Sequence, residues 1–198
     1  MMVEKIKLGI SACLLGEKVR YDGGHKLDPY LTKTLGKFVD WVPICPEVEC
    51  GLPTPRESMH LAGSAENPRL VTIRSNVDHT DRMIQWAEKR LDSLENEGLC
   101  GFIFKSRSPS SGMRDIKIHT SEGIPFSAKG VGIWARAFME RLPHIPVEDE
   151  GRLHDPDLRE DFIERVFVYF KYGCEKAGQR DSRSAGPQKQ EDTKKERK

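Results

Sequence analysis

Residues 38–56 read FVDWVPICPEVECGLPTPR, a stretch in which an apolar run is followed by a polar segment rich in proline and cysteine. The apolar run from Phe38 to Ile44 predicts a short buried strand, and at Cys45 the composition changes to Pro, Gly, Cys, Glu and Arg. Prolines fix φ and remove backbone donors, so we expect a stiff loop here and no helix. Ligands of open α/β sheets bind at such strand ends, which makes this loop the first candidate site.

Strand-like and helix-like patterns alternate along the chain. The expected strands lie at 6–12, 38–44, 69–73, 100–104, 116–118 and 144–147. The expected helices lie at 29–35, 78–94, 130–141 and 157–172. This alternation predicts an α/β fold, namely a three-layer Rossmann-like parallel sheet with helices on both faces, followed by a C-terminal helix.

Size and charge restrict the class of protein. The chain has 198 residues and a formal net charge of +1, which suits one domain with an appendage and gives no global basic field. We expect a domain over 1–150, a linker and C-terminal helix over 151–173, and a disordered charged tail over 174–198. No stretch approaches the roughly 18 apolar residues of a membrane span, and residues 1–8 lack the apolar run of a signal peptide. We therefore expect a cytoplasmic protein with no membrane partner.

Five cysteines are present, and three of them follow predicted strands. Cys13, Cys45 and Cys50 lie in loops, whereas Cys100 begins a strand and Cys174 lies in the tail. Thiols in loops of a cytoplasmic protein indicate a metal site or a reactive nucleophile. Their spacing leaves an iron–sulfur cluster, zinc and a chance arrangement as open alternatives.

The same strand ends carry further polar groups. Glu47 is a better acid–base candidate than Glu49 because it lies two residues from Cys45. The stretch 105–113, KSRSPSSGM, can present hydroxyls and backbone N–H groups to an anion, although it lacks the P-loop spacing. The loop 20–25 offers an aromatic face and hydrogen-bonding groups to a heterocycle, the alternative being an ordinary turn.

Several uncommon motifs occur in order, and together they identify a family by resemblance. They are SACLLG at 11–16, VRYDG at 19–23, CPEV at 45–48, GLPTPR at 51–56 and KSRSPS at 105–110. These motifs resemble those of the thiouracil desulfidase family, formerly catalogued as the domain of unknown function DUF 523. The resemblance covers roughly residues 5–147. Residues 146–166 are further similar to the junction, in longer relatives, to a second domain implicated in removing sulfur from thiolated uridine in RNA.

The resemblance implies a mechanism and a set of residues. A [4Fe-4S] cluster would be held by three cysteines, and the remaining iron would act as a Lewis acid on the substrate's sulfur. The implied reaction converts a thiolated pyrimidine, such as 2-thiouracil or 4-thiouridine, to the oxo base and sulfide. Glu47 matches an acid–base residue, and Ser108 matches a serine that orients substrate or water. The expected substrate contacts are Arg20, Tyr21, Asp22, Arg56, Ser110 and Ser111.

One position departs from the family pattern. The family places its third cysteine after Ser-Pro-Ser, where this chain has Ser111. We therefore predict that Cys50 replaces it and that Cys13, Cys45 and Cys50 bind the cluster, with Cys100 in reserve. The alternatives are a catalytically silent module that binds a nucleobase or RNA, and a zinc-dependent hydrolase that uses the same thiols. The expected partner is a small thiolated pyrimidine or thiolated transfer RNA, and a homodimer is the assembly to test.

Overall fold

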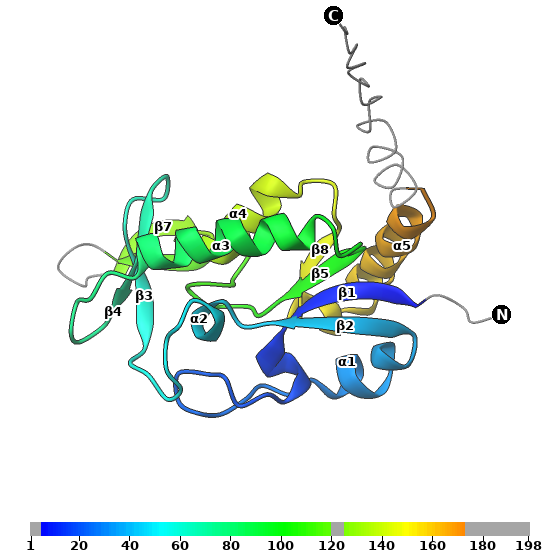
Figure 1. Cartoon of the computed structure of the whole chain (residues 1–198), viewed down its shortest axis with the longest axis horizontal. Helices are drawn as coiled ribbons and strands as arrows, with labels where there is room; N and C mark the ends of the chain where they lie inside the picture. Colours follow the sequence, from blue (N-terminus) through cyan, green and yellow to red (C-terminus); the bar gives the residue numbers. More distant parts are fainter. Residues whose placement is uncertain (1–4, 120–124, 173–198) are drawn as a thin grey trace, which may run out of the picture.

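The structure is a computed structural model, and it describes residues 5–119 and 125–172. Its centre is a four-stranded sheet in the order β2-β1-β5-β8, and every pairing in it is parallel (Figure 1). The strands are β1 Ile6–Ser11, β2 Val39–Ile44, β5 Gly101–Phe104 and β8 Val147–Asp149. The predicted parallel α/β sheet is confirmed, and its strands all end at one edge.

Helices cover both faces of this sheet and divide the core in two (Figure 1). They are α1 Pro29–Lys33, α3 Thr80–Leu94, α4 Ile133–Arg141 and α5 Pro156–Tyr172, with 3₁₀ turns η1 Ala12–Leu15, η2 Leu35–Lys37 and η3 Arg152–His154. The strand β5 shows the division, because Phe102 and Phe104 belong to the core under α3 and α4, whereas Ile103 belongs to the core under α1 and α5. The alternation of side chains along a strand produces this arrangement.

A second sheet, which the sequence did not predict as a unit, packs beside the first. Its order is β4-β3-β6-β7, and the strands are β3 Met59–Gly63, β4 Pro68–Thr72, β6 Ile116–His119 and β7 Pro125–Gly130. The pairs β3–β4 and β6–β7 are antiparallel, and β3–β6 is parallel. The short strands expected at 69–73 and 116–118 exist, but they belong to this mixed sheet and not to the parallel one.

The loop after β2 corrects one expectation. Residues Pro46–Glu49 form a one-turn helix, α2, where a loop without a helix was expected. Pro46 occupies the first turn, where the missing N–H costs nothing, and Cys45 has the extended backbone of an N-cap residue. Glu47 and Glu49 place negative charge in the first turn, which the helix dipole favours. Proline therefore starts a helix here.

The last strand and the C-terminal helix position the end of the chain. The strand expected at 144–147 is displaced to Val147–Asp149, so an acidic run now stands at its carboxyl end. Helix α5 buries Phe162 and Val166 against the core under α1. Within the two described ranges, no helix has both the length and the apolar character to cross a membrane. The predicted tail and Cys174 lie outside the described residues.

Candidate active site

A cavity of about 780 Å³ opens at the carboxyl edge of the parallel sheet. The segments that follow β1, β2, β5 and β8 all line it, as expected for parallel strands. Its volume is in the range of small-molecule sites. We call it the strand-end cavity. The candidate residues that line it are Cys13, Arg20, Tyr21, Cys45, Glu47, Arg56, Ser108, Ser110 and Ser111.

Two thiols face this cavity from neighbouring strands. The strands β1 and β2 end in register at Ser11 and Ile44, so the turns that carry Cys13 and Cys45 begin side by side. Burial raises the pKa of the Cys13 thiol to about 11, and Cys45 adds to that rise while the Lys105 charge opposes it. Burial also raises the pKa of Cys45. Without a bound cation both thiols therefore stay protonated at neutral pH, and a metal centre would displace those protons.

The structure separates Cys50 from these two thiols. Cys50 ends helix α2, its Sγ lies 3.3 Å from the carbonyl oxygen of Glu47, and its side chain packs against the core under α3. It does not line the strand-end cavity. Cys100 is buried just before β5, at the amino ends of the parallel strands and so opposite the cavity. In the part of the chain that the structure describes, no three His, Cys, Asp or Glu side chains form a group that could hold a metal ion.

Glu47 is held in a fixed position at the cavity wall. Arg56 Nε donates to Glu47 Oε2 at 2.8 Å, and a second nitrogen of the same guanidinium donates to the same oxygen. From the opposite loop, Ser110 Oγ donates to Glu47 Oε1 at 2.7 Å. The carboxylate is therefore orientated from two sides, which suits a group that must hold or move a proton at one place.

All the N–H groups of the Arg56 guanidinium donate hydrogen bonds to other groups of the protein. Besides the Glu47 contacts, Nη2 donates to the Val19 carbonyl at 2.9 Å, and Nη1 donates at 3.1 Å to the Pro53 carbonyl and to Thr54 Oγ1. A guanidinium has five N–H groups, and each has an acceptor here. The side chain is only 5% exposed. In this arrangement Arg56 joins three loops and positions Glu47.

The serine loop after β5 forms a chain of hydroxyl groups. Ser108 Oγ lies 3.0 Å from Ser110 Oγ, which in turn donates to Glu47. The Ser111 N–H donates to Ser108 Oγ at 3.2 Å. The N-terminus of α4 anchors this loop, because the backbone N–H of Trp134 donates to the Ser110 carbonyl at 2.9 Å. The Ser108 and Ser110 hydroxyls thus connect the cavity to the Glu47 carboxylate.

The sequence analysis missed Glu150, which holds the same loop from the end of β8. Its carboxylate accepts from the Ser106 N–H at 2.6 Å, from Ser106 Oγ at 2.7 Å and from Lys105 Nζ. The residue is only 9% exposed. A signal was present in the sequence, since the acidic run 148–150 follows an apolar strand just as the Cys45 loop does.

The loop after Val19 brings an aromatic ring and a cation to the cavity mouth. Arg20 and Tyr21 line the cavity, and the Arg20 guanidinium carbon lies 5.3 Å from the centroid of the Tyr21 ring. Asp22 does not line it; its carboxylate lies 3.4 Å from Arg20 Nε and accepts from the Gly24 N–H at 3.0 Å. The Gly24 hydrogen bond lowers the pKa of Asp22. Asp22 therefore shapes the turn that carries Arg20 and Tyr21.

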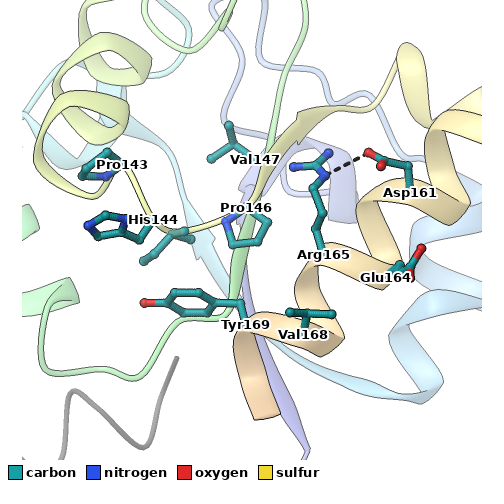
Figure 2. A pocket seen from close by; sticks show the side chains of 10 residues that line it. Pro143, His144, Pro146, Val147, Asp161, Glu164, Arg165, Val168 and Tyr169 are labelled. Carbon is teal, nitrogen blue, oxygen red and sulfur yellow. Dashed lines mark hydrogen bonds and ion pairs between the residues drawn. The ribbon is translucent and has the colours of Figure 1, made fainter. Parts of the chain in front are cut away.

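A second hollow lies between the start of β8 and α5, and it holds none of these groups (Figure 2). His144, Pro146 and Tyr169 line it, and its charged residues include Asp161 and Arg165, which pair with each other at 2.9 Å. No thiol is among the side chains that line this hollow. The strand-end cavity is therefore the candidate active site.

Fold and site together define an α/β protein whose ligand cavity is built from cysteine-bearing turns at the ends of parallel strands. The family model described as 2-thiouracil desulfurase matches residues 8–150, and the chain belongs to this family. The resemblance inferred from the motifs is thereby confirmed.

A solved structure gives a second comparison. The chain is similar to a [4Fe-4S]-dependent thiouracil desulfidase, TudS, with 34% sequence identity and a TM-score of 0.59. The match covers 79% of this chain and 97% of the other. No curated protein matches the chain.

Proposed function

We propose that this protein is a [4Fe-4S]-dependent desulfidase that converts a small thiolated pyrimidine to the oxo base and sulfide. The observation that carries the proposal is that Cys13, Cys45 and Glu47 line one cavity from two neighbouring strand ends. Family membership and the similarity to a thiouracil desulfidase support the reaction class. A cavity of about 780 Å³ favours a free base or nucleoside as substrate.

The donor set of the cavity fits an iron–sulfur group. Cys13 and Cys45 would hold the cluster, because thiolates are the soft ligands that such clusters require. Cys13 is buried, at 8% exposed, and Cys45 is half-buried beside the cavity. When bound, the cluster would supply a Lewis-acidic iron with affinity for the sulfur of a thiocarbonyl.

The chain's own residues supply proton handling. Replacing C=S by C=O takes the oxygen from water, which must lose its protons as sulfide leaves. Glu47 is placed to accept a proton at Oε1, where Ser110 Oγ now donates. Ser108, one hydroxyl further along at 3.0 Å, can orient the water or relay its proton.

The mouth of the cavity offers a surface for a flat ring. Tyr21 is 43% exposed and can stack on a pyrimidine, while the adjacent Arg20 can donate to a ring carbonyl. The Lys105 ammonium also faces the cavity, and Glu150 holds it in place. These groups suit a neutral, polar heterocycle.

The decisive test is an anaerobic assay of the iron- and sulfide-reconstituted protein against 2-thiouracil, 4-thiouridine and thiolated transfer RNA. We expect sulfide release and the oxo product from a free base or nucleoside, and no turnover after Cys13→Ala or Cys45→Ala. Cys100→Ala is the matched control, because Cys100 lies away from the cavity.

Other outcomes would identify the competing functions. A colourless, iron-free protein that still binds a nucleobase would indicate a silent binding module. Turnover supported by zinc alone would indicate a zinc hydrolase. Turnover restricted to transfer RNA would keep the chemistry and change the substrate.

A further inference from the structure

The strand-end cavity contains two thiols, whereas a cubane cluster has four irons to ligate. We propose that the Ser111 hydroxyl, and not the Cys50 thiol, is the third protein ligand of the cluster in this chain; this inference rests on the proposed function. The cluster would then be bound by two sulfurs and one oxygen, and one iron would stay open for the substrate.

The strand order places Ser111 correctly for this role. Cys45 follows β2, Cys13 follows β1 and Ser111 lies in the loop that follows β5, and these three strands are neighbours in the sheet. All three side chains line the same cavity. Ser111 is 4% exposed, so a ligand there is shielded from water as Cys13, at 8%, is. Three adjacent strand ends thus provide three donors around one volume.

The Ser111 hydroxyl is the available one in its loop. Ser108 Oγ accepts from the Ser111 N–H and lies 3.0 Å from Ser110 Oγ, and Ser110 Oγ donates to Glu47. Ser106 Oγ donates to Glu150 at 2.7 Å. Among the residues that the structure describes, Ser111 makes its hydrogen bond through its backbone N–H and none through its hydroxyl. The neighbouring hydroxyls are committed, whereas the Ser111 hydroxyl has no hydrogen-bond partner in residues 5–119 and 125–172.

Cys50 lies at the C-terminal end of helix α2 and does not line the cavity. Its N–H donates to the Pro46 carbonyl at 3.0 Å, and its Sγ contacts the Glu47 carbonyl oxygen at 3.3 Å. A second backbone hydrogen bond stabilises the same turn, because the Gly51 N–H donates to the Val48 carbonyl at 2.9 Å. To reach the cavity, the Cys50 thiol would have to leave the core under α3 and its contact with the Glu47 carbonyl oxygen. Ser111 already lines the cavity, which favours it over Cys50 as the ligand.

The coordination step is chemically simple. An Fe–Oγ bond forms, the hydroxyl proton leaves to solvent, and no electron is transferred. An alkoxide is a harder donor than a thiolate, so we expect a cluster with a more negative reduction potential and a weaker hold on its iron than three thiolates would give. The Ser111→Cys variant should reverse both properties.

The test measures iron and sulfide per chain, the rate of iron loss to a chelator, and the midpoint potential by EPR-monitored titration. The variants are Ser111→Ala, Ser111→Cys, Cys50→Ala and Ser58→Ala, all reconstituted anaerobically. Ser58 is the matched control, since it lines the same cavity without following β5. Circular dichroism of each metal-free variant confirms that it folds.

We expect Ser111→Ala to retain less than half of the wild-type iron, and Cys50→Ala and Ser58→Ala to match the wild type. Ser111→Cys should raise the potential and slow iron loss about tenfold. If Ser111→Ala keeps its iron and the wild-type potential, or if Cys50→Ala loses it, the ligand assignment is wrong while the proposed function stands. If the wild type assembles no cluster and Ser111→Cys does, the assignment and the proposed function both fail for this chain.

Discussion

The two ends of helix α2 carry the same kinds of side chain in opposite surroundings. At its start, Cys45 and Glu47 face the strand-end cavity. At its end, Cys50 packs against the core under α3, and Glu49 Oε2 lies 3.6 Å from Arg90 Nε while its Oε1 accepts from the Cys45 N–H at 3.0 Å. Each end has one thiol and one carboxylate, but only the first end meets the other strand ends. The two thiol–carboxylate pairs have the same residue types, and they differ in their position on helix α2.

The largest difference between the two ends should appear in stability. Arg56→Met removes the buried partner of Glu47, where the two side chains are only 5% and 13% exposed, so we expect unfolding free energy to fall by about 3–5 kcal/mol. Arg90→Met removes the more exposed cation that pairs with both Glu49 and Glu97, and it should cost less than about 1 kcal/mol. Urea unfolding of the metal-free proteins measures both. If both variants lose the same unfolding free energy, the buried Arg56–Glu47 pair stabilises the protein no more than the exposed pair does.

The next largest difference is expected in activity, between variants of Glu47 and variants of Glu49. Glu47→Gln keeps the shape of the side chain and removes its ability to take a proton, so kcat/KM for sulfide release should fall at least about 100-fold. Glu49→Gln should stay within threefold of the wild type, because its carboxylate lies outside the cavity. Iron content must match in both variants. A Glu47→Gln enzyme with near-normal turnover would remove Glu47 from the proton path.

The smallest effect concerns pH. Burial raises the pKa of Glu49, so the folded state favours its protonated form. The stability that this form contributes is present below the ordinary glutamate pKa of about 4.3 and is lost as pH rises through the raised value. Glu49→Gln should therefore be as stable as the wild type in acid and slightly more stable at neutral pH, by less than about 1 kcal/mol. Urea midpoints across this pH range test the sign, and a less stable variant at neutral pH would reverse it.

The sequence was informative where one local pattern determines position. The apolar runs before Cys13, Cys45 and Ser106 predicted parallel strands. Their loops converge if those strands are neighbours, and the structure supplies that strand order, which the sequence does not fix. The amphipathic spacing of Met83 and Leu91 likewise predicted α3, and both residues are buried.

The features that the sequence did not predict depend on contacts between residues far apart in the chain, or on which side of the short helix α2 a residue lies. Strand β3 pairs with β6 across more than fifty residues, and its five residues carry no alternation that predicts this. Glu150 meets Ser106 forty-four residues away. The side of α2 on which Cys50 lies depends on Pro46 starting a helix, which we had expected proline to prevent.

The contact of Glu150 with the serine loop also bears on synthesis. Lys105 and Ser106 leave the ribosome well before Glu150, which stands at the end of the last strand of the sheet. The growing polypeptide therefore carries an unfinished pocket until β8 has emerged and paired with β5.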